Sequence, residues 1–185
     1  MGTPKKHDAQ AVAQAVDCVV SSLAARHRDT RRLLLLGIAN GGIALAARLA
    51  QKLHAAGIAC GTGTIDISFH RDDISQHPIP KEFAPTLIPH DVGGATVVLV
   101  DDVLHSGRTV KAALDELFDH GRPARVELAV LVDRGGRRLP IAADYCGLTL
   151  AAGETEKVKV RLDNADPGHD EIYTEPAGKT AKLKI

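Results

Sequence analysis

The chain has 185 residues with 23 basic and 23 acidic side chains, so no net charge draws it to nucleic acid or to an anionic membrane. Apolar residues make up 44% of the chain but aromatic residues only 3%, which favours a core of Leu, Val, Ile and Ala, typical of a parallel sheet between helices. We therefore expect a single α/β domain over residues 1–185.

The cysteines and the apolar segments indicate the cellular compartment in which the protein works. Cys18, Cys60 and Cys146 are odd in number and widely spaced, which argues against a disulfide framework and against a zinc site. No apolar run has the length of a signal-peptide core or of a membrane span. We expect a cytoplasmic protein without a membrane partner.

The first part of the chain alternates between helical and strand patterns. Asp8 is the predicted N-cap of a helix that ends in the basic run 26–32. Residues 33–38 predict a buried strand, and residues 41–53 predict a helix closed by Gly57. Alternating polar and apolar residues over 63–70 predict a half-buried strand.

Residues 71–94 interrupt this alternation with four prolines and no sustained period. Such a segment is too long for a routine connection in a compact domain. We interpret it as a flexible loop that closes over a nearby site, with a disordered insertion as the alternative.

The remaining elements follow in a similar order. Apolar runs at 95–100 and 125–132 predict buried strands, an amphipathic pattern over 109–118 predicts a helix between them, and a short strand is expected around 142–147. The alternating Val158, Val160 and Leu162 predict an edge or hood strand, and residues 164–185 are expected to form a loose tail.

One segment combines a buried strand, two adjacent carboxylates, a loop rich in donors and the start of a helix. Asp101 and Asp102 stand where open α/β sheets bind ligands, and they can accept hydrogen bonds from a sugar diol or hold a divalent cation. The loop opens onto a helix N-terminus, which attracts phosphate. Neither a Gly-x-Gly-x-x-Gly motif nor a complete P-loop motif, Gly-x-x-x-x-Gly-Lys-Ser/Thr, competes with this interpretation. The segment comprises Val97, Val98, Leu99, Val100, Asp101, Asp102, Val103, Leu104, His105, Ser106, Gly107, Arg108 and Thr109.

This segment resembles the phosphoribosyl diphosphate (PRPP) signature of type I phosphoribosyltransferases. Blocks at 66–75, 128–135 and 139–147 look like those of the bacterial PyrR proteins, and the resemblance extends over roughly residues 8–163. PyrR proteins are uracil phosphoribosyltransferases, and in some bacteria they also bind pyrimidine-operon messenger RNA and attenuate transcription.

The resemblance implies the type I phosphoribosyltransferase fold, a central, mostly parallel sheet flanked by helices with a small hood and a flexible loop. It implies pyrimidine salvage in which uracil and PRPP give UMP and diphosphate with Mg²⁺. It also implies a homo-oligomer, dimer or tetramer, and a UMP-responsive contact with a pyr mRNA leader. Two alternatives stay open: an RNA-binding attenuation protein with a vestigial, nucleotide-sensing transferase site, and a purine phosphoribosyltransferase.

The resemblance also assigns residues to the parts of PRPP. Asp101 and Asp102 would hold the ribose hydroxyls and the metal, and the 5′-phosphate would lie on residues 105–109. The diphosphate loop would be Ala39, Asn40, Gly41 and Gly42, where many relatives carry a Lys-Thr-Arg-Gly type sequence and this chain has no charge. Arg71 is the predicted catalytic residue that restores the charge, with a solvated loop start as the alternative.

The base and the RNA are assigned in the same way. Relatives handle a base proton at the position of His105, which we interpret first as a phosphate-loop residue and second as a catalytic acid or base. Three basic stretches could contact RNA, the runs 26–32 and 157–161 and the turn with Arg134, Arg137 and Arg138, and a solvated face is the alternative for each. The resemblance points to the turn. The expected base-binding residues are Val132, Asp133, Arg134, Tyr145 and Cys146.

Overall fold

The computed structural model describes residues 6–68 and 85–177. Their elements follow one another as β1 (Lys6–His7), α1 (Ala9–His27), β2 (Leu33–Ile38), α2 (Gly41–Ala55), β3 (Gly61–Ile65), β4 (Thr96–Leu104), α3 (Arg108–Asp119), β5 (Arg125–Asp133), β6 (Tyr145–Thr149), β7 (Glu156–Arg161), the 3-10 turn η1 (Pro167–His169) and β8 (Glu171–Pro176).

A five-stranded parallel sheet with the order β3-β2-β4-β5-β6 forms the centre of the chain, as the sequence predicts. All six residues of β2 are buried, because helices cover both faces of the sheet. β4 is longer than the predicted 95–100, so Asp101 and Asp102 belong to the strand. β3 and β6 are displaced from the predicted 63–70 and 142–147 by a few residues.

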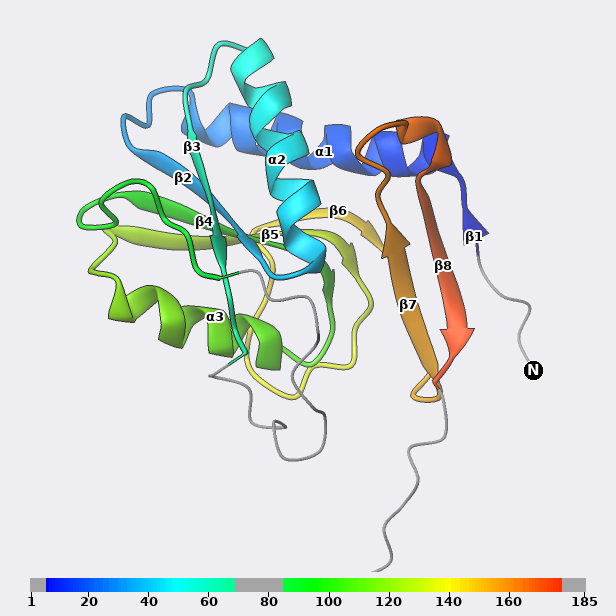
Figure 1. Cartoon of the computed structure of the whole chain (residues 1–185). Coiled ribbons are helices and arrows are strands. Elements are labelled where there is room, and N and C mark those ends of the chain that lie inside the picture. Colours follow the sequence, from blue (N-terminus) through cyan, green and yellow to red (C-terminus); the bar gives the residue numbers. More distant parts are fainter. Residues whose placement is uncertain (1–5, 69–84, 178–185) are drawn as a thin grey trace, which may run out of the picture.

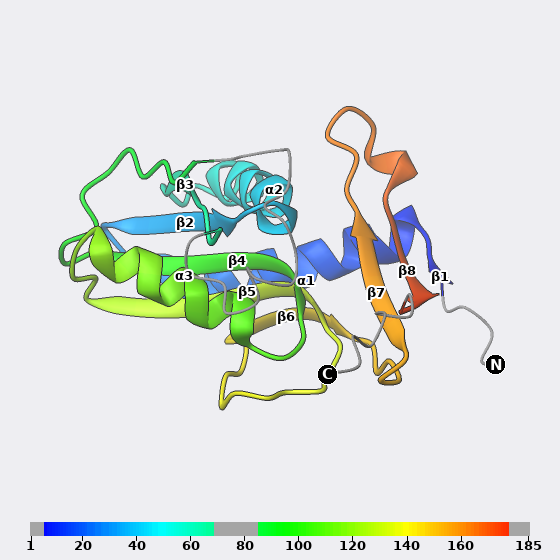
Figure 2. The ribbon, with the colours of Figure 1, turned by 60° about the horizontal axis from the view of Figure 1, so that its bottom comes forward.

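Helices α1 and α2 lie on one face of this sheet, and helix α3 lies on the opposite face (Figures 1 and 2). Leu23 of α1 and Leu45 of α2 belong to one buried cluster, and Leu117 of α3 belongs to the other. The neighbouring strands β2 and β4 therefore lead into helices on different sides. Ligands bind at such a switch point in open α/β sheets, where the two connections diverge and leave a crevice.

Helix α1 begins where the sequence predicts. The Asp8 carboxylate accepts a hydrogen bond from the Ala11 N–H at 3.0 Å, which satisfies one free donor of the first turn. The helix ends at His27, whose Nε2 lies 2.8 Å from both the Glu127 carboxylate and the Tyr145 hydroxyl. These three buried polar side chains connect α1 to β5 and β6.

A second, antiparallel sheet with the order β1-β8-β7 is the hood, and it stands beside the carboxyl edge of the central sheet (Figures 1 and 2). On one face of this sheet, Val158 and Ile172 pack in the same hydrophobic cluster as α1 and α2. The predicted hood strand is confirmed as β7. The expectation of a loose tail is wrong for residues 167–176, because Ile172 and Thr174 are buried in β8, the central strand of the hood. Residues 178–185 lie outside the described residues.

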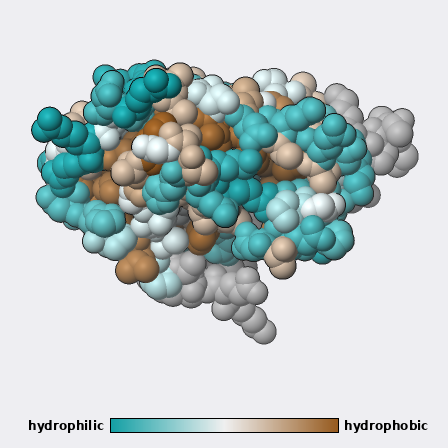
Figure 3. Space-filling view, turned by 90° about the horizontal axis from the view of Figure 1, so that it is seen from above, coloured by the Kyte–Doolittle hydropathy of each residue, from teal (hydrophilic) through white to brown (hydrophobic). Residues whose placement is uncertain are grey.

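Only the end of the predicted loop 71–94 is described. Leu87 pairs with Thr64 in an antiparallel bridge beside β3, and residues 71–84 lie outside the described residues. Within the described ranges, no helix is long and apolar enough to cross a membrane. Seen from above, the surface is largely hydrophilic with apolar side chains between the polar ones (Figure 3).

Candidate active site

A cavity of about 550 Å³ opens at the carboxyl edge of the central sheet, between β2, β4 and the hood. It lies at the switch point, and it brings together three segments that the sequence singles out: the loop after β2, the acidic pair and the start of α3. Its lining residues are Ala39, Asn40, Gly41, Ile67, Asp101, Asp102, Val103, Ser106, Arg108, Thr109 and Lys159.

Asp101 and Asp102 place two carboxylates side by side in this cavity. Asp101 is 6% exposed, and its Oδ1 accepts a hydrogen bond from the Asp102 N–H at 3.1 Å. Burial, followed by the charge of Asp102, raises the pKa of Asp101 well above its usual range, and burial also raises the pKa of Asp102. The pair is therefore short of positive partners, and sugar hydroxyls or a cation would stabilise its charged form.

The loop before α3 has the geometry of an anion site. Gly107 is the N-cap of α3 with φ +89°, a left-handed conformation that glycine adopts without strain. The Ser106 Oγ accepts a hydrogen bond from the Arg108 N–H at 3.3 Å, and the helix continues with a bond from the Lys111 N–H to the Gly107 carbonyl. The first-turn N–H groups and the hydroxyls of Ser106 and Thr109 are suited to a phosphate group.

The loop after β2 lies against the acidic pair. A Cβ on Gly41 would lie 2.4 Å from the Asp102 carboxylate, and a Cβ on Gly42 would lie 1.9 Å from the Val100 carbonyl oxygen. Glycine is thus required at Gly42, where the clash is with the backbone of β4, whereas a side chain at Gly41 would displace the Asp102 carboxylate. The peptide between Ala39 and Asn40 is cis.

His105 has a different position from the one expected of a catalytic acid or base. It is exposed and does not line the cavity, and its imidazole lies against Gly136. Partial burial, then the charges of Arg134, Arg137 and Arg138, lower its pKa, so the ring is neutral near pH 7. Of its two interpretations, the position in the loop is the one that the geometry favours.

Arg137 cross-links the phosphate loop to the loop after β5. Its Nη1 donates to the carbonyls of Leu104 at 3.2 Å and His105 at 2.7 Å, its Nε donates to the Ile141 carbonyl at 2.9 Å, and its Nη2 pairs with Asp133. These donors are occupied inside the chain. The expectation that Arg137 contacts RNA is therefore not supported, and its observed role is to hold the loop before α3.

Arg134 also departs from its expected role. Its side chain is buried, with Nη2 donating to the Gly153 carbonyl at 3.1 Å, so it cannot offer its charge to RNA without rearrangement. Arg138 alone of the three predicted arginines is largely exposed, 3.8 Å from Glu154. The basic turn is thus a weaker candidate for an RNA-binding surface than the sequence implies.

Tyr145 and Cys146, expected beside the base, lie elsewhere. Tyr145 pairs with Ala129, four residues before the end of β5, which is about 13 Å from the carboxyl edge at the usual rise per residue. Its hydroxyl donates to Glu127 at 2.7 Å, and burial, then this bond, raises its pKa. The Cys146 thiol donates to the Leu148 carbonyl. The geometry does not favour a contact of either residue with the base, which stays a prediction, because Tyr145 is buried and both lie at the start of β6.

Val132 and Asp133 end β5 beside β4, at the correct edge of the sheet. Val132 is fully buried, however, and the Asp133 carboxylate accepts from Arg137 and from the Gly135 N–H. A contact of these residues with a base stays a prediction. Arg71 lies outside the described residues.

Two lining residues, Ile67 and Lys159, are not among the site residues that the sequence predicts. The sequence pattern favours a solvated face for Lys159, because its strand alternates polar and apolar residues as any edge strand does. Only the packing of the hood over the carboxyl edge brings it to the cavity, and no local pattern carries that information.

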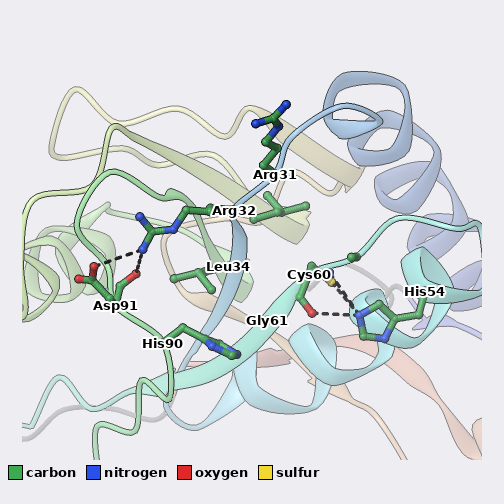
Figure 4. A pocket seen from close by; sticks show the side chains of 10 residues that line it. Arg31, Arg32, Leu34, His54, Cys60, Gly61, His90 and Asp91 are labelled. Atoms are coloured by element: carbon green, nitrogen blue, oxygen red, sulfur yellow. Dashed lines mark hydrogen bonds and ion pairs between the residues drawn. The ribbon is translucent and has the colours of Figure 1, made fainter.

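A second cavity of about 410 Å³ lies at the opposite edge of the sheet, where β2 and β3 begin. Figure 4 shows His54 beside Cys60 and Arg32 paired with Asp91 on its walls. The His54 Nε2 lies 2.9 Å from the Cys60 carbonyl oxygen and 3.5 Å from its sulfur. The amino edge is not where parallel sheets bind substrates, so we assign the chemistry to the first cavity.

Fold and cavity together define an α/β protein whose site suits a phosphorylated sugar. The family described as "Phosphoribosyl transferase domain" matches residues 7–162. The protein "Bifunctional protein PyrR" of Corynebacterium glutamicum is 45% identical over 163 residues, which cover 87% of this chain and 84% of that protein. The protein of the same name from Deinococcus deserti is 47% identical over 162 residues, which cover 85% and 87%. The chain belongs to the phosphoribosyl transferase domain family and, within it, to the PyrR proteins.

Solved structures agree on the fold. The hypoxanthine phosphoribosyltransferase of Trypanosoma cruzi matches with a TM-score of 0.66 at 20% identity, covering 91% of this chain and 94% of that one. The type I phosphoribosyltransferase fold expected from the sequence is confirmed.

Proposed function

We propose that this chain transfers the phosphoribosyl group of PRPP to uracil, which gives UMP and diphosphate. The observation that carries the proposal is the single cavity that is lined both by the carboxylate pair Asp101 and Asp102 and by the start of α3. The PyrR relatives, which are identical to this chain at 45% and 47% of the aligned residues, support the choice of a pyrimidine.

The residues would act mostly by position and charge. The N–H groups before and in the first turn of α3, with Ser106 and Thr109, would bind the 5′-phosphate. Asp101 and Asp102 would accept hydrogen bonds from the two ribose hydroxyls, so that their charge lies beneath the anomeric carbon as it becomes cationic. The loop 39–42 would bind the departing diphosphate through backbone N–H groups and the Asn40 amide.

The donor set fits Mg²⁺. Two carboxylates with raised pKa values offer oxygen ligands, and substrate oxygens and water would complete the shell, as is usual for this ion. Bound there, Mg²⁺ would neutralise the charge of the leaving diphosphate. Among the described residues, no group of three or more His, Cys, Asp or Glu side chains could hold a metal by itself.

The test is turnover of uracil, hypoxanthine and guanine with PRPP and Mg²⁺. We expect UMP to form, and we expect Asp102→Asn to lower kcat/KM by about 10²–10³-fold, the usual cost of removing one group that stabilises developing charge. Turnover of a purine in place of uracil would move the proposal to the purine class. An absence of turnover with every base would leave the vestigial, nucleotide-sensing site.

We also propose a UMP-responsive contact with a pyr mRNA leader, since the relatives carry the word "bifunctional" in their names. Arg134 is buried and the donors of Arg137 are bonded inside the chain, so this turn offers less exposed positive charge to RNA. The contact must therefore use other surfaces as well. A gel shift of a leader hairpin that strengthens with UMP and weakens with salt would support it. No shift at low salt would leave the enzyme alone.

We also propose that the protein is cytoplasmic and forms a homo-oligomer. Cys18, Cys60 and Cys146 are all free, which agrees with a reducing cytoplasm, and a homo-oligomer is expected from the PyrR resemblance.

A further inference from the structure

The cavity at the carboxyl edge has few positive groups for the ligand that it is proposed to hold. PRPP carries a phosphate at one end and a diphosphate at the other, and the cavity adds two carboxylates of its own. The loop 39–42 consists of Ala, Asn and two Gly residues and has no charge. Of the described residues that line the cavity, two are cationic, Arg108 and Lys159.

These two cations come from different elements, α3 and β7. Arg108 is the first residue of α3, next to the loop proposed to bind the 5′-phosphate. Lys159 comes from β7 of the hood, which contacts β4 across the cavity. Its charge acts on Asp102, whose pKa it lowers against the larger effect of burial. A Cβ on Gly41 would meet the Asp102 carboxylate, so Asp102 lies beside the loop 39–42, and Lys159 lines the same cavity as both.

The backbone of Lys159 is fixed by strand β7, whereas its side chain is half exposed. Val158 beside it is buried in the main cluster, and Lys159 pairs in register with Tyr173 of β8. The ammonium group is 3.7 Å from a Glu175 carboxylate oxygen, and both side chains are about half exposed, so this ion pair is weak and the ammonium group can exchange it for a more highly charged anion.

We propose that Lys159 binds the diphosphate group of PRPP and supplies, from the hood, the positive charge that the loop 39–42 lacks. The inference rests on the proposed function only in that PRPP is the substrate. It adds a residue that binds one end of that substrate and gives the hood a chemical role.

The proposal separates the two ends of PRPP, and this makes it testable. Lys159→Met should weaken the binding of PRPP, measured by calorimetry with Mg²⁺ and without a base, by about 10–100-fold, the value of one hydrogen bond between charged groups. Inhibition by diphosphate should weaken by a similar factor. The affinity for UMP, which has the 5′-phosphate and the ribose but no diphosphate, should stay within about twofold of the parent.

The controls isolate the charge and its place. Lys157→Met removes a lysine two residues away on the same strand that does not line the cavity, and it should leave all three affinities unchanged. Lys159→Arg keeps the charge and should retain most of the affinity for PRPP. Lys159→Gln is a second neutral variant, and thermal melting confirms that each variant folds.

Two results would overturn the proposal. One is an affinity of the neutral Lys159 variants for PRPP and diphosphate equal to that of the parent. The other is an equal loss of affinity for PRPP and UMP, which would mean that Lys159 only compensates the acidic pair. If the parent binds PRPP through Lys159 but does not turn over uracil, the proposed function fails while this assignment stands.

Discussion

Asp101 shows, at the scale of a single residue, how the site opposes stability. Burial and the neighbouring Asp102 raise its pKa in the folded chain, so the folded state favours the protonated acid. The stability that this group contributes is present at low pH and is lost as the pH rises above the unfolded value near 4. Asp101→Asn keeps the shape and the acceptor for the Asp102 N–H. We expect it to raise the melting temperature at pH 7.5 by about 2–4 °C, the effect of ~1 kcal/mol in a chain of this size, while turnover falls.

The check is a series of melts from pH 4 to pH 8 without ligand. The difference between Asp101→Asn and the parent should shrink toward pH 4, where both chains are neutral at this position. Asp115→Asn, on the exposed face of α3, serves as the control and should change the melting temperature little at any pH. A variant less stable than the parent at pH 7.5 would mean that the charged acid stabilises the fold.

Tyr145 has the opposite character, since it stabilises a buried charge far from the cavity. Burial raises the pKa of Glu127, but hydrogen bonds from Tyr145 and Arg125, then the charges of His27 and Arg26, bring it below its ordinary value. This stabilisation is present above pH ~4.5 and is lost as the pH falls. Tyr145→Phe removes the donor, and we expect a loss of about 1–3 kcal/mol at pH 7.5.

Chemical denaturation at pH 7.5 and pH 4, together with the KM for uracil, checks this prediction. The loss should be smaller at pH 4, and the KM should not change. Tyr173→Phe in the hood is the matched control. A rise in the KM for uracil with unchanged stability would return Tyr145 to the base-binding residues.

The loop between β4 and α3 is an element whose conformation depends on a side chain outside it. Arg137 donates to the carbonyls of Leu104 and His105 and pairs with Asp133. Arg137→Met should leave these acceptors without a donor, lower stability by about 2–4 kcal/mol and raise Kd for both PRPP and UMP, because both use the 5′-phosphate site. Arg137→Lys should not restore binding, since an ammonium group cannot reach the same set of acceptors.

Calorimetry with the two ligands and thermal melting measure these effects. Arg138→Met, which changes the exposed neighbour, should alter stability by less than about 0.5 kcal/mol and leave the two Kd values unchanged. Equal behaviour of the two variants would contradict the structural role of Arg137.

The glycine before α3 tests the same element through the backbone. Gly107 and Gly57 both have positive φ, +89° and +79°, but a Cβ would be 3.3 Å from Leu139 and Ile141 at Gly107 and would meet nothing at Gly57. Both Gly→Ala variants should lose about 1–2 kcal/mol to backbone strain. Only Gly107→Ala should also weaken the binding of UMP, which calorimetry measures. A similar loss of UMP affinity in Gly57→Ala would mean that the loss does not come from the conformation of the loop before α3.

The elements that the sequence predicts well are those whose signal is local. The buried runs of β2 and β5, the Asp8 cap of α1 and the acidic pair before a helix all follow from periods, caps and motifs within a few residues. The roles that failed depend on distant contacts. Tyr145 carries no mark of its bond to Glu127, Arg137 none of its carbonyl acceptors, and Lys159 none of the cavity that faces it.

At the scale of the whole molecule, the hood and the central sheet share one hydrophobic cluster. Val158 and Ile172 of the hood pack in the cluster that contains Val16 of α1 and Leu45 of α2. Arg48 of α2 also pairs with Asp170 just before β8. Covering the carboxyl edge in this way closes the cavity on its hood side, so the stability of the hood and the binding of the substrate are linked.

Ile172→Ala tests whether the chain unfolds as one domain. Ile172 is 0% exposed in the central strand of the hood, so its truncation should cost about 2–5 kcal/mol and lower the melting temperature by about 5–15 °C. Because the cluster is shared, far-UV circular dichroism and the loss of UMP binding should give one coincident transition in parent and variant. Thr174→Ala, also buried in β8 but of smaller volume, should produce a smaller shift of the same single transition. Two separated transitions, with UMP still bound after the first, would show that the hood folds as an independent unit.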